Sequence, residues 1–193
     1  GHTGAPISSV SAINGEIVVG CSAVTSNLGV RAANFVSDGA WYKRQSYDMA
    51  WLLTIADRNL DDVTVKWASA GSQYIVNNAV NDIAITVLPD APTDPATGLP
   101  VPTIAVATDG GVSVIKDDGT VVDSASTVAK GVVFFDSAFG VWAGRNTSNH
   151  TLMYSTMEDY QAGDGFGDIV AETSTATAWE FPLLVRPMHA TSL

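Results

Sequence analysis

The chain has 193 residues, of which 46% are hydrophobic and only 15% are charged. An average globular protein carries about 25% charged residues, so this composition favours a folded chain over a disordered one. One domain with a substantial core is sufficient at this length, and we expect a single domain over residues 1–193.

The charge balance excludes one class of partner. The 20 acidic residues outnumber the 9 basic ones and give a net charge of -11, which repels nucleic-acid phosphates, so we expect no nucleic-acid binding. The clearest apolar run, residues 49–56, is far shorter than the about 20 residues of a membrane helix, so we expect no membrane insertion. The single cysteine, Cys21, can form no disulfide within the chain, and we expect it to be a small buried side chain.

The first part of the chain reads as short strands separated by turns. Residues 8–22 predict a hairpin around the Asn-Gly turn at 14–15, because tight hairpins require positive φ angles that glycine adopts freely. Residues 30–44 predict a second hairpin around a turn at 37–39. Residues 49–59 fit a buried strand or a short helix, and we favour a strand.

The second part repeats this plan. Residues 89–102 contain five prolines, which predicts a surface loop and the best internal boundary of the chain. Residues 103–123 predict a three-stranded meander with Asp-Gly turns at 109–111 and 117–119. Residues 131–156 predict a further set of strands.

These segments predict an all-β fold. Short antiparallel meanders that recur along the chain are typical of the blades of a β-propeller, and a chain of this length would hold about four blade-like units. We therefore expect a β-propeller or partial propeller. A lectin-like β-sandwich remains the alternative, because sandwiches share the short strands and turns.

Catalytic signals are weak. Phosphate-binding, dinucleotide-binding and nucleophile-elbow motifs are absent from the sequence, so we expect no cofactor and no enzyme activity. Glu158 and Asp159 are adjacent, and on a strand adjacent side chains point to opposite faces, where they cannot flank one glycosidic bond. A glycoside hydrolase is accordingly the least favoured class.

Metal signals are equally weak. The three histidines lie far apart in the sequence, which argues against zinc. Asp117, Asp118 and Asp123 surround a glycine turn, and residues 163–168 also alternate Gly and Asp in an acidic loop. Calcium loops use such residues, but tight turns use them as well, and we favour turns and expect no metal site.

Aromatic residues offer the best candidate for a ligand-binding site. Trp142, Arg145, His150 and Tyr154 fall within one expected hairpin, and glycan-binding surfaces combine aromatic rings with polar side chains. A second polar-aromatic group occupies residues 41–44, with the sequence Trp-Tyr-Lys-Arg. The simpler interpretation, which we favour for both groups, is that the rings pack the sheets.

Three segments carry a family resemblance. Residues 27–44 (NLGVRAANFVSDGAWYKR), 81–98 (NDIAITVLPDAPTDPATG) and 98–123 (GLPVPTIAVATDGGVSVIKDDGTVVD) resemble tail-associated or tail-fibre-like virion structural proteins of marine bacteriophages. The resemblance implies a segment of a much longer tail protein, located in the virion or outside the cell. Its partners would be other virion proteins or a host-surface glycan.

The expected function is therefore a non-catalytic structural or adhesion module that presents binding loops. A stand-alone carbohydrate-binding propeller is the alternative. The sequence leaves the ligand and the oligomeric state open.

Overall fold

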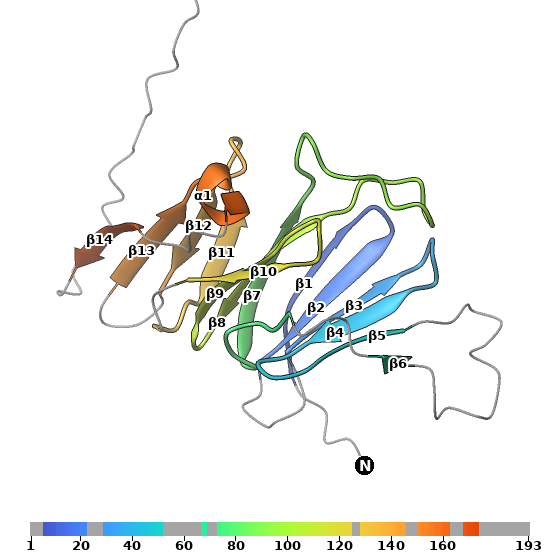
Figure 1. The fold of residues 1–193 in the computed structure, drawn as a ribbon. Coiled ribbons are helices and arrows are strands. Elements are labelled where there is room, and N and C mark those ends of the chain that lie inside the picture. Colours follow the sequence, from blue (N-terminus) through green and yellow to red (C-terminus); the bar gives the residue numbers. More distant parts are fainter. Residues whose placement is uncertain are drawn as a thin grey trace, which may run out of the picture.

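The computed structural model describes residues 6–22, 29–51, 67–68, 73–124, 128–145, 150–162 and 168–173. These residues form antiparallel sheets and one short helix, which confirms the predicted all-β class. Figure 1 shows three sheets that follow one another along the chain, with the second sheet between the first and the third. Helices long and apolar enough to cross a membrane do not occur within these ranges.

Each sheet is a meander whose strands follow in chain order. The first sheet consists of β1 (Ile7–Ile13), β2 (Glu16–Cys21), β3 (Val30–Asn34), β4 (Ala40–Lys43), β5 (Asp48–Trp51) and β6 (Trp67–Ala68). The second consists of β7 (Val80–Thr86), β8 (Thr103–Thr108), β9 (Gly111–Ile115) and β10 (Val121–Asp123). The third consists of β11 (Val132–Phe135), β12 (Val141–Gly144), β13 (His150–Ser155) and β14 (Asp168–Thr173).

The turns behave as the sequence predicts. Asn14 and Gly15 have φ angles of 53° and 77°, the conformation of a type I′ turn, and they close the β1–β2 hairpin with Ile13 opposite Glu16. The meander at 103–123 is also confirmed as β8, β9 and β10. Turn chemistry thus determines which residues pair within each sheet.

Three other expectations concern a strand, a loop and the single cysteine. The expected strand at 49–59 is confirmed as far as β5 reaches, and residues 52–59 lie outside the described residues. The proline-rich segment 89–102 connects β7 and β8, which are neighbours in one sheet. Cys21 is a buried free thiol, as expected.

Glu158 and Asp159 do not lie on a strand, which corrects the expectation for this pair. They form the first turn of α1 (Met157–Ala162). Thr156 caps this helix: its Oγ1 accepts a hydrogen bond from the Asp159 amide at 3.2 Å, and the Asp159 carboxylate accepts one from the Thr156 amide at 3.2 Å. This reciprocal pair is a capping box, which begins a helix even in a strand-rich sequence.

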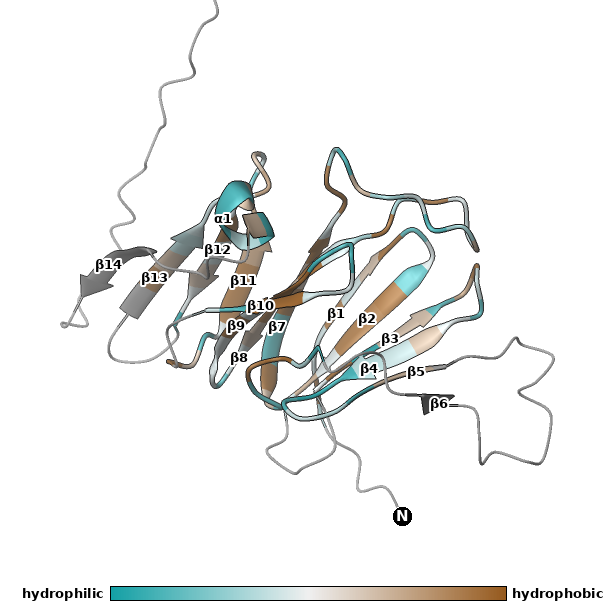
Figure 2. Cartoon of the chain, viewed as in Figure 1, coloured by the Kyte–Doolittle hydropathy of each residue, from teal (hydrophilic) through white to brown (hydrophobic). Residues whose placement is uncertain are grey.

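The second sheet is buried on both faces. Every residue of β8 and β9 is buried, and alternate side chains point into two separate hydrophobic clusters. Ile104, Val106 and Ile115 belong to the cluster shared with the first sheet. Ala105 and Val114 belong to the cluster shared with the third sheet and α1. Figure 2 shows the apolar residues of these central strands between the other two sheets.

The first strands of the three sheets lie side by side. β1 packs against β7, and β7 packs against β11. Asp82 of β7 joins all three: its Oδ1 accepts a hydrogen bond from the Ser9 hydroxyl of β1 at 2.9 Å, and its Oδ2 accepts one from the Val133 amide of β11 at 3.0 Å. One carboxylate therefore connects the three sheets where their first strands meet.

Candidate functional site

A cleft of about 380 Å³ lies between the first and second sheets. Its volume falls in the range of small-molecule binding sites, roughly 300 to 1,000 Å³. Its walls include both aromatic and charged side chains. They include Glu16, Trp41, Lys43, Ile104, Lys116 and Asp118.

Glu16 and Trp41 form a hydrogen-bonded pair in the wall of this cleft. Strand pairing places Glu16 and Val18 on the face of β2 that turns toward the second sheet, and Trp41 of β4 lies on the same face. The indole Nε1 donates a hydrogen bond to Glu16 Oε1 at 2.7 Å. Glu16 is 8% exposed, and this burial raises its pKa, partly opposed by the Trp41 hydrogen bond and aided by the charge of Asp94. The pair fixes an indole ring and a carboxyl group side by side.

The cleft continues toward the proline-rich loop as a smaller chamber of about 60 Å³. Both parts share Glu16, and the smaller chamber adds the amide side chains of Asn14 and Asn34. Asn14 Nδ2 donates a hydrogen bond to the Pro100 carbonyl at 2.8 Å, which ties the β1–β2 turn to the loop. The two chambers therefore meet at Glu16, Val101 and Pro102, which line both.

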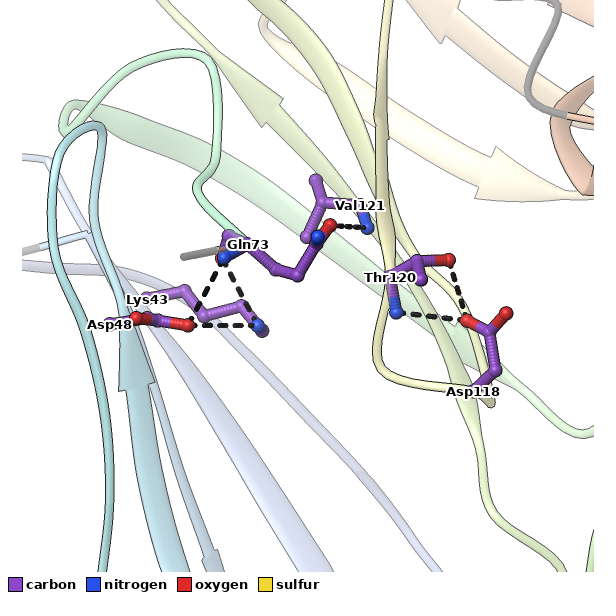
Figure 3. A network of polar contacts seen from close by, with 6 residues as sticks. All are labelled: Lys43, Asp48, Gln73, Asp118, Thr120 and Val121. Carbon is purple, nitrogen blue, oxygen red and sulfur yellow. Dashed lines mark hydrogen bonds and ion pairs between the residues drawn. The ribbon is translucent and has the colours of Figure 1, made fainter. Parts of the chain in front are cut away.

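Lys43, which also lines the cleft, belongs to a network of polar contacts (Figure 3) and is buried, as is its partner Asp48. Its Nζ donates a hydrogen bond to the Gln73 carbonyl at 3.1 Å and lies 3.8 Å from Asp48 Oδ2. The backbone amide of Gln73 donates to the same Asp48 oxygen at 3.2 Å. The side-chain oxygen Oε1 of Gln73 accepts a hydrogen bond from the backbone amide of Val121 at 2.9 Å. Burial lowers the pKa of Lys43, and the charge of Asp48 opposes that shift. Gln73 thus joins the first sheet to β10.

Asp118 lies at the rim, in the β9–β10 turn. Its Oδ1 accepts hydrogen bonds from the Thr120 amide at 2.8 Å and the Thr120 hydroxyl at 2.6 Å, and its Oδ2 lies 3.5 Å from Lys116 Nζ. Burial raises the pKa of Asp118, but these bonds and the lysine charge outweigh it and leave the pKa lowered. Asp118 therefore stabilises the turn. Groups of three or more metal-ligating side chains are not found within the described ranges.

The structure brings together two of the four residues singled out from the sequence. The rings of Trp142 and Tyr154 face each other across β12 and β13, with centroids 4.5 Å apart. Phe134 of β11 stacks on the other side of Trp142, with centroids 6.3 Å apart and planes 7° apart. Trp142 Nε1 donates to Asp136 Oδ2 at 3.0 Å. The three rings form a row across the third sheet, which we call the aromatic row.

The other two residues of that group are placed less fully. Arg145 directly follows β12, and its Nε is buried, with no hydrogen-bond partner among the residues that the structure describes. His150 is the first residue of β13, and its side chain lies outside the described part of the structure.

The sequence group at 41–44 divides between two faces. Trp41, Tyr42 and Lys43 are all among the residues that line the cleft. Because strand residues alternate, the side chains of Trp41 and Lys43 point to one face of β4 and that of Tyr42 points to the other. The Arg44 guanidinium lies 4.7 Å from the Tyr42 ring centroid and 5.0 Å from that of Tyr47.

Glu16 was missed at the level of sequence. The sequence feature that could have identified it is its position, a charged residue on the same strand face as Val18. A carboxyl group on a core-facing strand position is unusual unless it has a partner or a function.

Comparison of the chain with protein-family models, with curated protein sequences and with solved structures found no match.

Proposed function

We propose that the chain is a non-catalytic adhesion module of a virion, built as part of a β-propeller within a larger phage tail protein, and that it binds a host-surface glycan. The observation that carries the binding role is the Glu16–Trp41 pair in the wall of the cleft. The virion setting rests on the sequence resemblance of residues 27–44 and 81–123.

The arrangement of the sheets supports the propeller. Propeller blades are up-and-down meanders whose first strands line a common axis, while neighbouring blades pack face to face. The contacts of β1 with β7 and of β7 with β11 match that pattern. A sandwich consists of two facing sheets, whereas here a middle sheet is covered on both faces. The propeller is therefore favoured over the sandwich.

The composition of the cleft supports a neutral glycan as the ligand. Sugars present hydroxyl groups that bond to carboxyl and amide groups, and apolar C–H faces that pack on aromatic rings. Trp41 supplies the ring and Glu16 supplies the carboxyl group. Asn14 and Asn34 line the smaller chamber, where Asn14 Nδ2 already donates to the Pro100 carbonyl and Asn34 Oδ1 already accepts from the amides of Val36 and Ser37. Lys43 is held by Asp48 and the Gln73 carbonyl, so the cleft does not depend on a charged ligand.

A glycan array followed by calorimetry with the best hit tests this role. We expect Trp41→Phe and Glu16→Gln each to weaken binding at least about tenfold, equivalent to about 1.4 kcal/mol. Trp142→Phe is the matched control, because that ring lies in the aromatic row and not in the cleft. Thermal unfolding of each variant shows whether the fold is intact.

The outcomes separate the parts of the proposal. Binding lost with Trp142→Phe and kept with Trp41→Phe would move the site to the aromatic row. If no glycan on a broad array binds, the proposed ligand class is refuted. If the protein is absent from purified virions, the proposed structural role is refuted.

A glycoside hydrolase is the second candidate, favoured by one observation. Glu16, with a raised pKa, and Asp118, with a lowered pKa, both line the cleft, and hydrolases pair such a proton donor with an ionised carboxylate. Against it, Asp118 is already engaged by Thr120 and Lys116. Turnover of an array hit that disappears in Glu16→Gln would establish the hydrolase and refute the non-catalytic role.

A further inference from the structure

The two end sheets each have one face that the rest of the described chain leaves open. The third sheet uses Val133, Val141 and Met153 to pack toward the second sheet. Because strand residues alternate, the aromatic row of Phe134, Trp142 and Tyr154 lies on its opposite face. Phe134 is 48% exposed, and Val132 beside it is 47% exposed. This face carries large apolar groups that water reaches.

The outer face of the first sheet is the counterpart at the other end of the stack (Figure 1). Strand pairing places Val10, Val19, Arg31, Tyr42 and Met49 in one row from β1 to β5. Tyr42 and Met49, at the far end of this row, also border the cleft. Val10 is 58% exposed. The row therefore combines apolar and aromatic groups with a basic side chain, and the stacked guanidinium of Arg44 lies beside it.

These two faces are complementary. The outer face of the first sheet carries guanidinium groups next to tyrosines. The outer face of the third sheet carries the aromatic row, in which Trp142 donates a hydrogen bond to Asp136. Guanidinium groups pack favourably on aromatic faces and pair with carboxylates. A contact between the faces would also continue the sheet-on-sheet packing that joins the first sheet to the second and the second to the third.

We propose that a second copy of this chain covers both faces. The third sheet of each copy packs on the first sheet of the other, so that two identical head-to-tail contacts close a ring of six sheets with two-fold symmetry. Closure of this kind leaves neither face open, whereas a contact that did not close would build filaments. The inference rests on the propeller-like stacking in the proposed function, but it does not depend on a glycan.

The mass of the purified chain in solution tests the proposal, by light scattering after size-exclusion chromatography at up to about 100 µM. We expect a dimer. Phe134→Glu and Tyr42→Glu should each yield monomers, because each places a charge within both contacts of the ring. Phe35→Glu is the matched control: Phe35 is 73% exposed but belongs to the β3–β4 turn, and this variant should remain dimeric.

Mixing the two monomeric variants identifies the geometry. In a head-to-tail ring, the unaltered first sheet of a Phe134→Glu chain packs on the unaltered third sheet of a Tyr42→Glu chain. One of the two contacts is then intact, so the mixture should form dimers that neither variant forms alone. Circular dichroism of each variant excludes unfolding as the cause of dissociation.

Several results would overturn the proposal. A monomeric wild-type chain at every concentration, assemblies that keep growing with concentration, or a Tyr42→Glu variant that remains dimeric would each do so. Glycan binding by the monomeric Phe134→Glu variant would show that the cleft works independently of the dimer, so the two proposals can fail separately.

Discussion

Asp82 is the residue whose removal should weaken the fold most directly. Its carboxylate accepts one hydrogen bond from Ser9 in the first sheet and one from the Val133 amide in the third. Asp82→Ala removes both of these bonds between sheets, together with the bond that Oδ1 accepts from the Ile83 amide, and leaves the amide of Val133, a residue only 3% exposed, without this acceptor. We expect both joins between sheets to weaken at once.

The magnitude follows from the two bonds. A hydrogen bond to a charged group contributes about 1.5 to 3 kcal/mol, and Asp82 is partly exposed, so the lower figure applies to each bond. Asp82→Ala should therefore lower the free energy of unfolding by about 3 kcal/mol. For a domain of this size that corresponds to a fall in Tm of about 6 to 12 °C. Asp82→Asn keeps one carbonyl oxygen and should lose about half as much.

Urea unfolding of the two variants and of an Asp90→Ala control measures this effect. Asp90 is exposed in the loop after β7, so its replacement should change the free energy of unfolding by less than about 0.5 kcal/mol. If Asp82→Ala loses less than about 1 kcal/mol with an unchanged urea dependence, the carboxylate does not hold the sheets together and the reasoning is refuted.

Three further changes test the turn, the cap and the buried acid. Gly15→Ala should lower the free energy of unfolding by about 1 to 2 kcal/mol, because alanine is strained at a φ of 77° and its Cβ would clash with Val36. Urea unfolding measures the loss, with Gly39→Ala as the control because the φ angle of Gly39 is not positive. Thr156→Ala should lower stability by about 1 kcal/mol in thermal unfolding, whereas Thr156→Ser should keep the cap. The raised pKa of Glu16 means that the folded state holds its proton more tightly, so stability falls as pH rises from the ordinary value of 4.5 through the raised pKa. Glu16→Gln should reduce that fall in a pH series of urea unfolding, and an unaltered pH profile would contradict the assignment.

Hairpins could be predicted from the sequence because their determinants are local. Asn14 and Gly15 both require positive φ, and only a few residue types adopt it cheaply, so the turn and its register follow from two letters. The same reasoning holds for the Asp-Gly turns of the meander at 103–123. Short-range chemistry thus fixes the class of the fold and most strand pairs.

The helix α1 and the cleft could not be predicted from the pattern of strands alone. Thr156 and Asp159 carry a capping signal that outweighs the surrounding β pattern. Glu16 and Trp41 lie 25 positions apart and meet only because β2, β3 and β4 pair in the observed register. Periodicity gives the face of each side chain but not which distant strand it will meet.

The chain-order pairing within each sheet has a consequence for how the protein opens. Strands pair with their sequence neighbours, so each described sheet is a local unit, and no backbone ladder within the described residues joins one sheet to another. Such units open separately in native-state hydrogen exchange. Amides of β8 and β9, covered on both faces, should exchange most slowly, whereas an end sheet can detach by breaking a single interface and leave the middle sheet protected.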